Sequence, residues 1–181
     1  MRTGVAVCRV ILVGMMGSGK TTIGRLLSEA TGWPYVDNDE LVSRHSGATA
    51  RQLLAEGGTP RLREVESAAL ALGLELPAPV IVGVAAGTVL DPANRDAMRS
   101  AGVVVWLHAS AETLIARAAD AAHRPFIDRD GTHWMGETAA EREPLYEEVA
   151  DVSVDTGTGD PEDSVRLLRS HLARIGACAP A

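Results

Sequence analysis

The chain is poor in lysine, cysteine and basic charge, and it has no long hydrophobic run. Its 181 residues include 24 acidic and 17 basic ones, which gives a net charge of −7. Non-specific nucleic-acid binding needs a basic face and anionic membranes attract polybasic segments, so this balance argues against both kinds of partner. The longest uncharged stretch, residues 76–90, is shorter than the roughly 18–20 apolar residues of a membrane-spanning helix.

Cysteine occurs at only two positions, Cys8 and Cys178, which lie near opposite ends of the chain. The two form neither a CxxC metal pair nor a disulfide framework, which favours a reducing compartment. The apolar run near the start leads into a glycine-rich turn rather than into the small-residue cleavage site of a signal peptide. These features predict a soluble protein of the cytoplasm.

Lysine is the scarcest charged residue, because one of the 17 basic residues, Lys20, is lysine and all the others are arginine. A chain that uses arginine almost everywhere has kept lysine at a single position. Arginine is a wide planar fork, whereas the lysine ammonium is a compact point charge. A site that accepts only the smaller cation would explain this exception.

Short β-rich runs alternate with longer helical patterns, which indicates βαβ units around a parallel sheet. We expect strands at residues 9–13, 35–36, 80–82, 103–107 and 152–154. We expect helices at residues 21–31, 40–45, 50–56, 61–72, 92–100, 111–121, 139–149 and 161–175. This pattern predicts an α/β fold with three α/β/α layers and a central five-stranded parallel sheet. One domain would cover residues 9–175, with flexible ends at residues 1–8 and 176–181.

Residues 123–138 break this alternation, because they are polar, contain glycine and show no regular period. A long irregular insert in a compact domain is usually either a functional loop or a disordered segment. Trp134 and Met135 add apolar bulk to it. We predict irregular structure throughout this insert.

Residues 14–21, GMMGSGKT, match the phosphate-binding pattern G-x-x-x-x-G-K-[ST] at every fixed position. A chance match somewhere in a chain of this length is expected on the order of one time in a hundred. The glycines let successive backbone N–H groups point at phosphate oxygens, and the helix N-terminus adds partial positive charge. Lys20 would reach the β- and γ-phosphates of ATP, and Thr21 would hold Mg²⁺. The predicted nucleotide-binding residues of this loop are Gly14, Gly17, Ser18, Gly19, Lys20, Thr21 and Thr22.

Asp37 and Asp39 follow the second predicted strand, at the edge where open α/β sheets bind ligands. Their spacing directs both side chains the same way if the strand continues, so that one could approach Mg²⁺ and the other a substrate hydroxyl. Aspartate is also a preferred helix N-cap, and a helix is predicted directly after these residues. Spacing alone leaves the two interpretations open.

Taken in order, the motifs resemble those of the shikimate kinase family from about residue 9 to the last helix. The resemblance is carried by GMMGSGKTTIGRLL, YVDNDELV, SGATARQLLAEGGTPRLREVE, RPF, REPLYEEVAD and VDTGTGDP. It implies a P-loop kinase fold related to nucleoside monophosphate kinases, in which residues 123–138 form a lid. It also implies a monomer that transfers a phosphoryl group from ATP to a small hydroxylated carboxylic acid, with shikimate as the default acceptor.

The resemblance further implies a role for each matching residue. On the nucleotide side, Lys20 binds phosphate, Thr21 ligates Mg²⁺ and Asp37 helps to hold the ion. Arg117 and Pro161 would enclose the adenine ring.

On the acceptor side, the resemblance implies that Asp39 binds ring hydroxyls and helps to deprotonate the attacking one. Arg63 and Arg142 would clamp the substrate carboxylate, which suits the fork geometry of arginine. Arg124, in the lid, would stabilise charge on the transferring phosphoryl group. Without the resemblance, each of these arginines is more often a solvated or ion-paired side chain.

The chain departs from the family pattern after the third strand, where typical members carry three consecutive glycines. Here the matching stretch reads Val84-Ala85-Ala86-Gly87. The resemblance implies that the backbone amides of Ala86 and Gly87 bind the acceptor, but alanine adds a methyl group and disfavours positive φ. The departure motivates an alternative, a related kinase for another cyclic polyol or hydroxy acid, such as an aminoshikimate-, quinate- or gluconate-like compound. A further alternative is a non-catalytic nucleotide-binding protein on the same fold.

Overall fold

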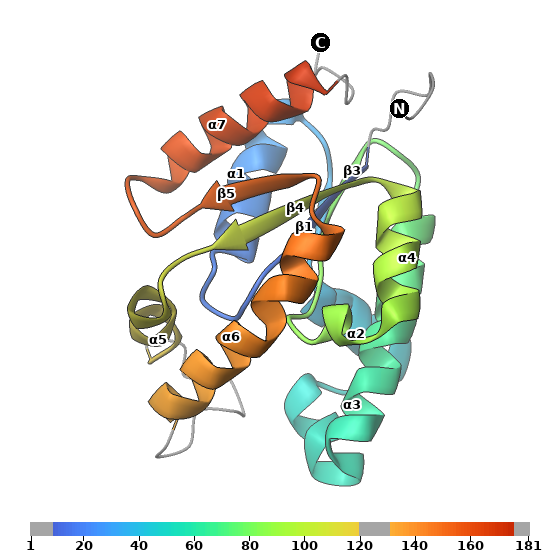
Figure 1. Ribbon diagram of the computed structural model, residues 1–181. Helices are drawn as coiled ribbons and strands as arrows, with labels where there is room; N and C mark the ends of the chain where they lie inside the picture. Colours follow the sequence, from blue (N-terminus) through green and yellow to red (C-terminus); the bar gives the residue numbers. More distant parts are fainter. Residues whose placement is uncertain (1–8, 120–130, 176–181) are drawn as a thin grey trace.

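Five parallel strands form the central sheet, in the order β2-β3-β1-β4-β5 (Figure 1). The computed structural model describes residues 9–119 and 131–175, with residues 118, 119 and 131–133 described by their backbone alone. The predicted flexible ends, residues 1–8 and 176–181, lie outside this range. The strands are β1 (Arg9–Val13), β2 (Tyr35–Val36), β3 (Val80–Gly83), β4 (Val103–His108) and β5 (Val152–Asp155). All five predicted strands are confirmed, and three of them extend one residue further than expected.

Helices connect consecutive strands, as a parallel sheet requires. They are α1 (Lys20–Thr31), α2 (Asn38–Ser46), α3 (Ala50–Glu75), α4 (Pro92–Ala101), α5 (Ala111–Ala119), α6 (Gly131–Val149) and α7 (Pro161–Arg174). A short 3₁₀ turn, η1 (Thr88–Leu90), precedes α4 and was not predicted. No helix within the described ranges is long and apolar enough to cross a membrane.

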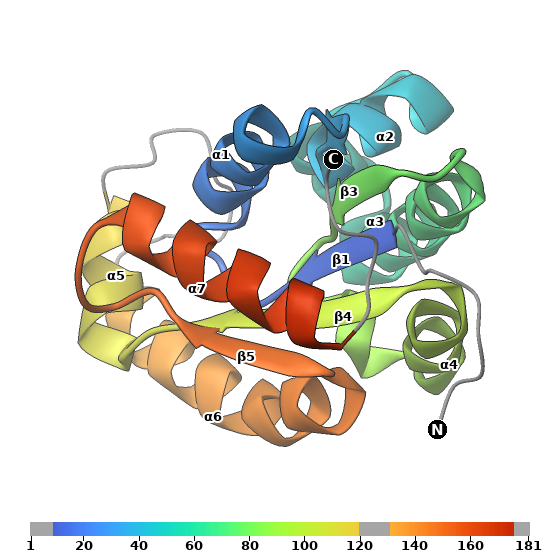
Figure 2. The same cartoon turned by 90° about the horizontal axis from the view of Figure 1, so that it is seen from above.

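Alternate residues of the buried strands face two separate hydrophobic clusters, which gives the three predicted layers. In β1, Val10 and Leu12 pack with residues of α1 and α7 on one face of the sheet. Ile11 and Val13 pack with residues of α2, α3, α4 and α6 on the other face (Figure 2). These four side chains are fully buried, and each such burial contributes roughly 1.5–3 kcal/mol. A sheet covered on both faces explains why β1 is a continuous apolar run.

The two helices predicted on either side of GGTP meet at a kink within α3. Gly58 has non-helical backbone angles, φ 67° and ψ −166°, and Pro60 follows it. Positive φ is accessible to glycine without the penalty that a Cβ would bring. The kink sets the direction of the second part of α3, which carries Arg63 into the cleft described below.

The prediction of irregular structure over residues 123–138 is wrong for its second half, because α6 begins at Gly131. Among residues 134–149 of this helix, the buried ones are Met135, Thr138, Arg142, Tyr146 and Val149. Their spacing is that of one helical face, but the face includes a threonine and an arginine. Polar residues do not contribute to apolar periodicity, so this periodicity indicates the helix only from residue 139. Residues 123–130 lie outside the described part of the chain.

Candidate active site

A cleft of about 800 Å³ opens at the carboxyl edge of the sheet, where the segments after β1, β2 and β3 meet. The strand order reverses at β1, and open α/β sheets bind ligands at such a point. Side chains from α3, α5 and α6 complete the walls. The predicted site residues that line it are Gly17, Gly19, Lys20, Thr21, Thr22, Asp37, Asp39, Arg63, Ala86, Gly87, Arg117 and Arg142.

The loop between β1 and α1 has the backbone of a phosphate cradle. Gly14, Gly17 and Gly19 have φ values of 145°, 83° and 88°, which L side chains rarely adopt. A Cβ at Gly14 would overlap the main chain of β4, and one at Gly17 would lie 2.8 Å from a carbonyl oxygen of α5. Conformation therefore favours glycine at all three positions, and close packing adds a second requirement at Gly14 and Gly17.

Lys20 begins α1 and lines the cleft beside this loop. Its Nζ donates hydrogen bonds to the carbonyl oxygens of Gly14 at 2.8 Å and Met15 at 2.9 Å. The ammonium is thus held at the mouth of the loop, on the side where the helix N-terminus points. Ser18 is fully buried within the loop and does not line the cleft.

Asp37 caps α2, as one of the two interpretations predicts, and it also contacts Thr21. Its Oδ1 accepts a hydrogen bond from the N–H of Asp39 at 3.1 Å and caps α2. Its Oδ2 accepts hydrogen bonds from Thr21 Oγ1 at 2.8 Å and from the Tyr35 hydroxyl at 2.7 Å. Burial by itself raises the pKa of Asp37, but these three hydrogen bonds outweigh burial and hold the pKa below its ordinary value. The carboxylate is therefore ionised and fixed against Thr21.

Thr21 and Asp37 supply a hydroxyl and a carboxylate oxygen, which are the donors that Mg²⁺ prefers. The described residues contain no cluster of three or more histidine, cysteine or acidic side chains that could hold a metal by itself. Mg²⁺ in phosphate-transferring sites is usually held by one or two protein groups, waters and substrate phosphates. The donor set fits an ion of this kind.

Two arginines and one glutamate form the charged wall opposite the phosphate loop. Arg63 is ion-paired with Glu66 on the next turn of α3, and the Glu66 side chain is only 9% exposed. Burial raises the pKa of Glu66, and Arg63 and Arg142 partly offset this effect. Arg142, from α6, is buried, and its desolvation, together with the charge of Arg63, lowers its pKa. The wall thus presents two guanidinium groups side by side, and paired guanidinium groups suit a carboxylate ligand.

The segment Val84–Gly87 departs from the triple glycine without backbone strain. No non-glycine residue in the described ranges has positive φ, so Ala85 and Ala86 adopt ordinary conformations. Both are half-buried and line the cleft. At Gly87, in contrast, a Cβ would overlap the Arg63 guanidinium. A Cβ at Gly87 would therefore displace the end of the Arg63 side chain, whereas positions 85 and 86 accept alanine without strain.

Three of the predicted ligand residues that the structure describes, Gly14, Ser18 and Pro161, do not line the cleft. Arg117 lines it and donates to the carbonyl oxygen of Thr156 at 2.6 Å, and its assignment to the adenine ring stays a prediction. Pro161 opens α7 and is exposed, but it does not line the cleft. Arg124 lies outside the described residues, and its assignment to the transferring phosphoryl group stays a prediction.

Glu66, Tyr35 and Tyr146 contact predicted site residues but had no role in the sequence prediction. The sequence does indicate an ion pair between Glu66 and Arg63, because residues three apart on a helix are neighbours and these two residues have that spacing. The two tyrosines had no such signal, since a lone aromatic residue in a strand or helix is usually part of the core.

The sequence profile of the shikimate kinase family matches residues 16–173 of this chain. Shikimate kinase from Pseudomonas syringae pv. tomato is 37% identical over 167 residues, which cover 92% of this chain and 96% of that protein. Shikimate kinase from Xanthomonas oryzae pv. oryzae is 37% identical over 165 residues, which cover 91% of each.

Solved structures agree with these relatives. Shikimate kinase from Acinetobacter baumannii in complex with shikimate matches with a TM-score of 0.85 and 28% identity, covering 92% of this chain and 93% of that one. A gluconokinase from Sinorhizobium meliloti matches with a TM-score of 0.66 over 96% of this chain and 95% of that one. Its identity is 22%, so this second likeness is one of fold alone.

Proposed function

This chain belongs to the shikimate kinase family, and from that premise we propose that it transfers the γ-phosphoryl group of ATP to a ring hydroxyl of shikimate, forming shikimate 3-phosphate. The observation that carries the proposal is the composition of the cleft, which has a phosphate cradle on one side and the two guanidinium groups of Arg63 and Arg142 on the other. A donor with three phosphates and an acceptor with one carboxylate match these two halves.

On the nucleotide side, we assign phosphate binding to Lys20 and to the amides of the loop. Mg²⁺, when bound, would neutralise charge on the β- and γ-phosphates, held by Thr21 and, largely through water, by Asp37. The hydrogen bond from Thr21 to Asp37 supports this assignment, because it leaves a lone pair of the hydroxyl oxygen for the ion. Arg117 is assigned to the adenine side.

On the acceptor side, we assign the substrate carboxylate to Arg63 and Arg142. Asp39 is exposed into the cleft, which supports its assignment to the ring hydroxyls and to deprotonation of the attacking one. Arg124 is assigned to charge stabilisation on the transferring group. Phosphoryl transfer depends mainly on such positioning and charge stabilisation, so these few groups are enough.

A coupled ADP-release assay with Mg-ATP and a panel of shikimate, quinate, aminoshikimate and gluconate tests the function directly. We expect the highest kcat/KM for shikimate and no ADP release without an acceptor. A higher kcat/KM for another member of the panel would show that the acceptor is not shikimate. Tight ATP binding with no phosphorylated acceptor would support the non-catalytic alternative.

The methyl groups of Ala85 and Ala86 are expected to narrow the acceptor pocket. The double variant Ala85→Gly, Ala86→Gly removes them from the cleft wall, and we expect a several-fold lower KM for shikimate with an unchanged KM for ATP. The variant should also lose about 1–2 kcal/mol of unfolding free energy, because two unstrained alanines are replaced by glycine. Steady-state kinetics and urea unfolding measure the two effects. An unchanged shikimate KM would show that these methyl groups do not shape the pocket.

A further inference from the structure

The segment that follows β3, residues 84–90, is called here the acceptor loop, and all of its central carbonyl groups are engaged. Two of them accept hydrogen bonds from within the loop. The carbonyl of Ala85 accepts from the N–H of Thr88 at 3.1 Å, and that of Gly87 accepts from the N–H of Leu90 at 3.1 Å. These two bonds close the turn and form η1.

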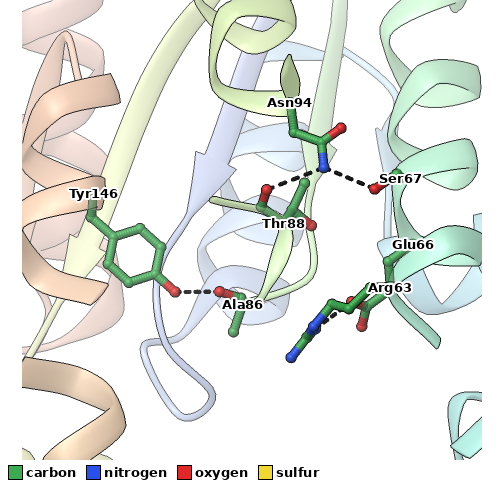
Figure 3. A network of polar contacts seen from close by, with 7 residues as sticks. All are labelled: Arg63, Glu66, Ser67, Ala86, Thr88, Asn94 and Tyr146. Carbon is green, nitrogen blue, oxygen red and sulfur yellow. Dashed lines mark hydrogen bonds and ion pairs between the residues drawn. The ribbon is translucent and has the colours of Figure 1, made fainter. Parts of the chain in front are cut away.

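Side chains from α4 and α6 hold the other three carbonyls. Tyr146 donates to Ala86 O at 2.7 Å and Asn94 donates to Thr88 O at 3.2 Å (Figure 3). Arg95 donates to Val89 O at 2.7 Å. Asn94 also donates to Ser67 Oγ at 2.9 Å and so ties the loop to α3. The acceptor loop is therefore fixed from two sides, by Asn94 and Arg95 just after it and by Tyr146, 60 residues beyond Ala86.

The hydrogen bond from Tyr146 determines where one amide points. A trans peptide is planar, with its C=O and N–H directed oppositely, so the N–H of Gly87 points away from Tyr146. Figure 3 shows Tyr146 on one side of Ala86 and Arg63 on the other. Gly87 lies directly against the Arg63 guanidinium. No hydrogen bond within the described part of the chain engages the N–H of Ala86 or Gly87.

Tyr146 is itself rigidly held. It is 1% exposed, and its ring stacks on Trp106 with centroids 6.0 Å apart and planes 15° from parallel. It follows Arg142 by one turn of α6, so a single helix supports both the acceptor loop and the charged wall. Burial raises the pKa of the Tyr146 phenol, which keeps the hydroxyl protonated as a donor.

We propose that Tyr146 is a positioning residue for the phosphoryl acceptor: by holding Ala86 O, it aims the Gly87 N–H into the cleft beside Arg63. Asn94 and Arg95 fix the far end of the same loop. The inference rests on the proposed function, because it assigns the acceptor to the side of the cleft that contains Arg63. In this proposal the direction of the Gly87 N–H is set by Tyr146, whose own side chain does not line the cleft.

Tyr146→Phe tests the proposal, because it removes the hydroxyl and keeps the buried ring. We expect the KM for shikimate to rise about tenfold, the effect of roughly one lost hydrogen bond. The KM for ATP should stay within about twofold, because the nucleotide side is not touched. Isothermal titration of shikimate without nucleotide should show a similar loss of affinity. A variant that only weakened the fold would raise both KM values or neither.

Ser28→Ala is the matched control. The Ser28 hydroxyl donates to a main-chain carbonyl, that of Trp33, at 2.6 Å, but it does not line the cleft. We expect Ser28→Ala to leave both KM values unchanged even where its melting temperature falls as much as that of Tyr146→Phe. An unchanged shikimate KM in Tyr146→Phe, or an equal rise in the control, would overturn the proposal.

The proposed function fails separately, in the wild-type chain, if shikimate is not phosphorylated there. In that case the same two variants are compared with whichever acceptor of the panel the wild type phosphorylates. If none is phosphorylated, the positioning role falls together with the function.

Discussion

Replacing Lys20 with alanine is expected to lower kcat by about 10²–10³-fold, the usual effect of removing one group that stabilises transition-state charge. The Lys20 ammonium lies at the mouth of the phosphate loop, over the carbonyls of Gly14 and Met15. Its side chain contributes little to the core, because it is only partly buried and faces the cleft. Coupled ADP release measures the loss of kcat, and circular dichroism with thermal melting checks that the fold persists.

Lys20→Arg sharpens the same prediction. The chain uses arginine at every other basic position, so retention of lysine here predicts that a guanidinium does not fit the loop. We therefore expect Lys20→Arg to restore less than a tenth of the wild-type kcat. Arg166→Ala, which removes an exposed arginine of α7, serves as the control and should stay within about twofold of wild type. Near-normal kcat in Lys20→Ala would contradict the assignment of the loop.

The layers of the fold were predictable because buried strands leave a simple mark in the sequence. Residues 10–13 and 103–107 are continuous apolar runs, and both lie in strands buried on two faces. Residues 131–138 of α6 were not predictable in this way, since the buried face of the helix includes Thr138 and Arg142. Arg142 borders the cleft, and a pattern of hydrophobicity does not contain a reason of that kind.

The two sides of the candidate site also differ in how far the sequence predicts them. The phosphate loop is a contiguous motif whose geometry depends on its own glycines, so its residues could be named from sequence alone. The acceptor side depends on contacts between α3, α6 and the acceptor loop, which lie far apart in the chain. The family resemblance pointed to Arg63 and Arg142, and helical spacing places Glu66 beside Arg63, but the contact of Tyr146 with Ala86 follows only from the assembled fold.

Arg63→Ala is expected to raise the KM for shikimate by about 10²-fold, since truncating one partner of a charged hydrogen-bonded pair costs about 2–5 kcal/mol. The KM for ATP should change less than about threefold, because Arg63 lies across the cleft from the phosphate loop. The same substitution leaves the buried Glu66 without its ion-pair partner. Burial already raises the pKa of Glu66, so the unpaired carboxylate should destabilise the fold as well.

A double variant separates the two effects. Arg63→Ala combined with Glu66→Gln removes the unpaired buried charge, and we expect the double variant to regain most of the unfolding free energy lost in Arg63→Ala. The KM for shikimate should stay raised, because the second substitution restores no cation for the carboxylate. Recovery of the shikimate KM together with stability would mean that Arg63 supports the wall of the cleft without binding the acceptor.

The single variant Glu66→Gln gives a further expectation. The Glu66 carboxylate interacts electrostatically with Arg142 as well as with Arg63, and glutamine removes this competing negative charge. Glu66→Gln alone should therefore lower the shikimate KM or leave it unchanged.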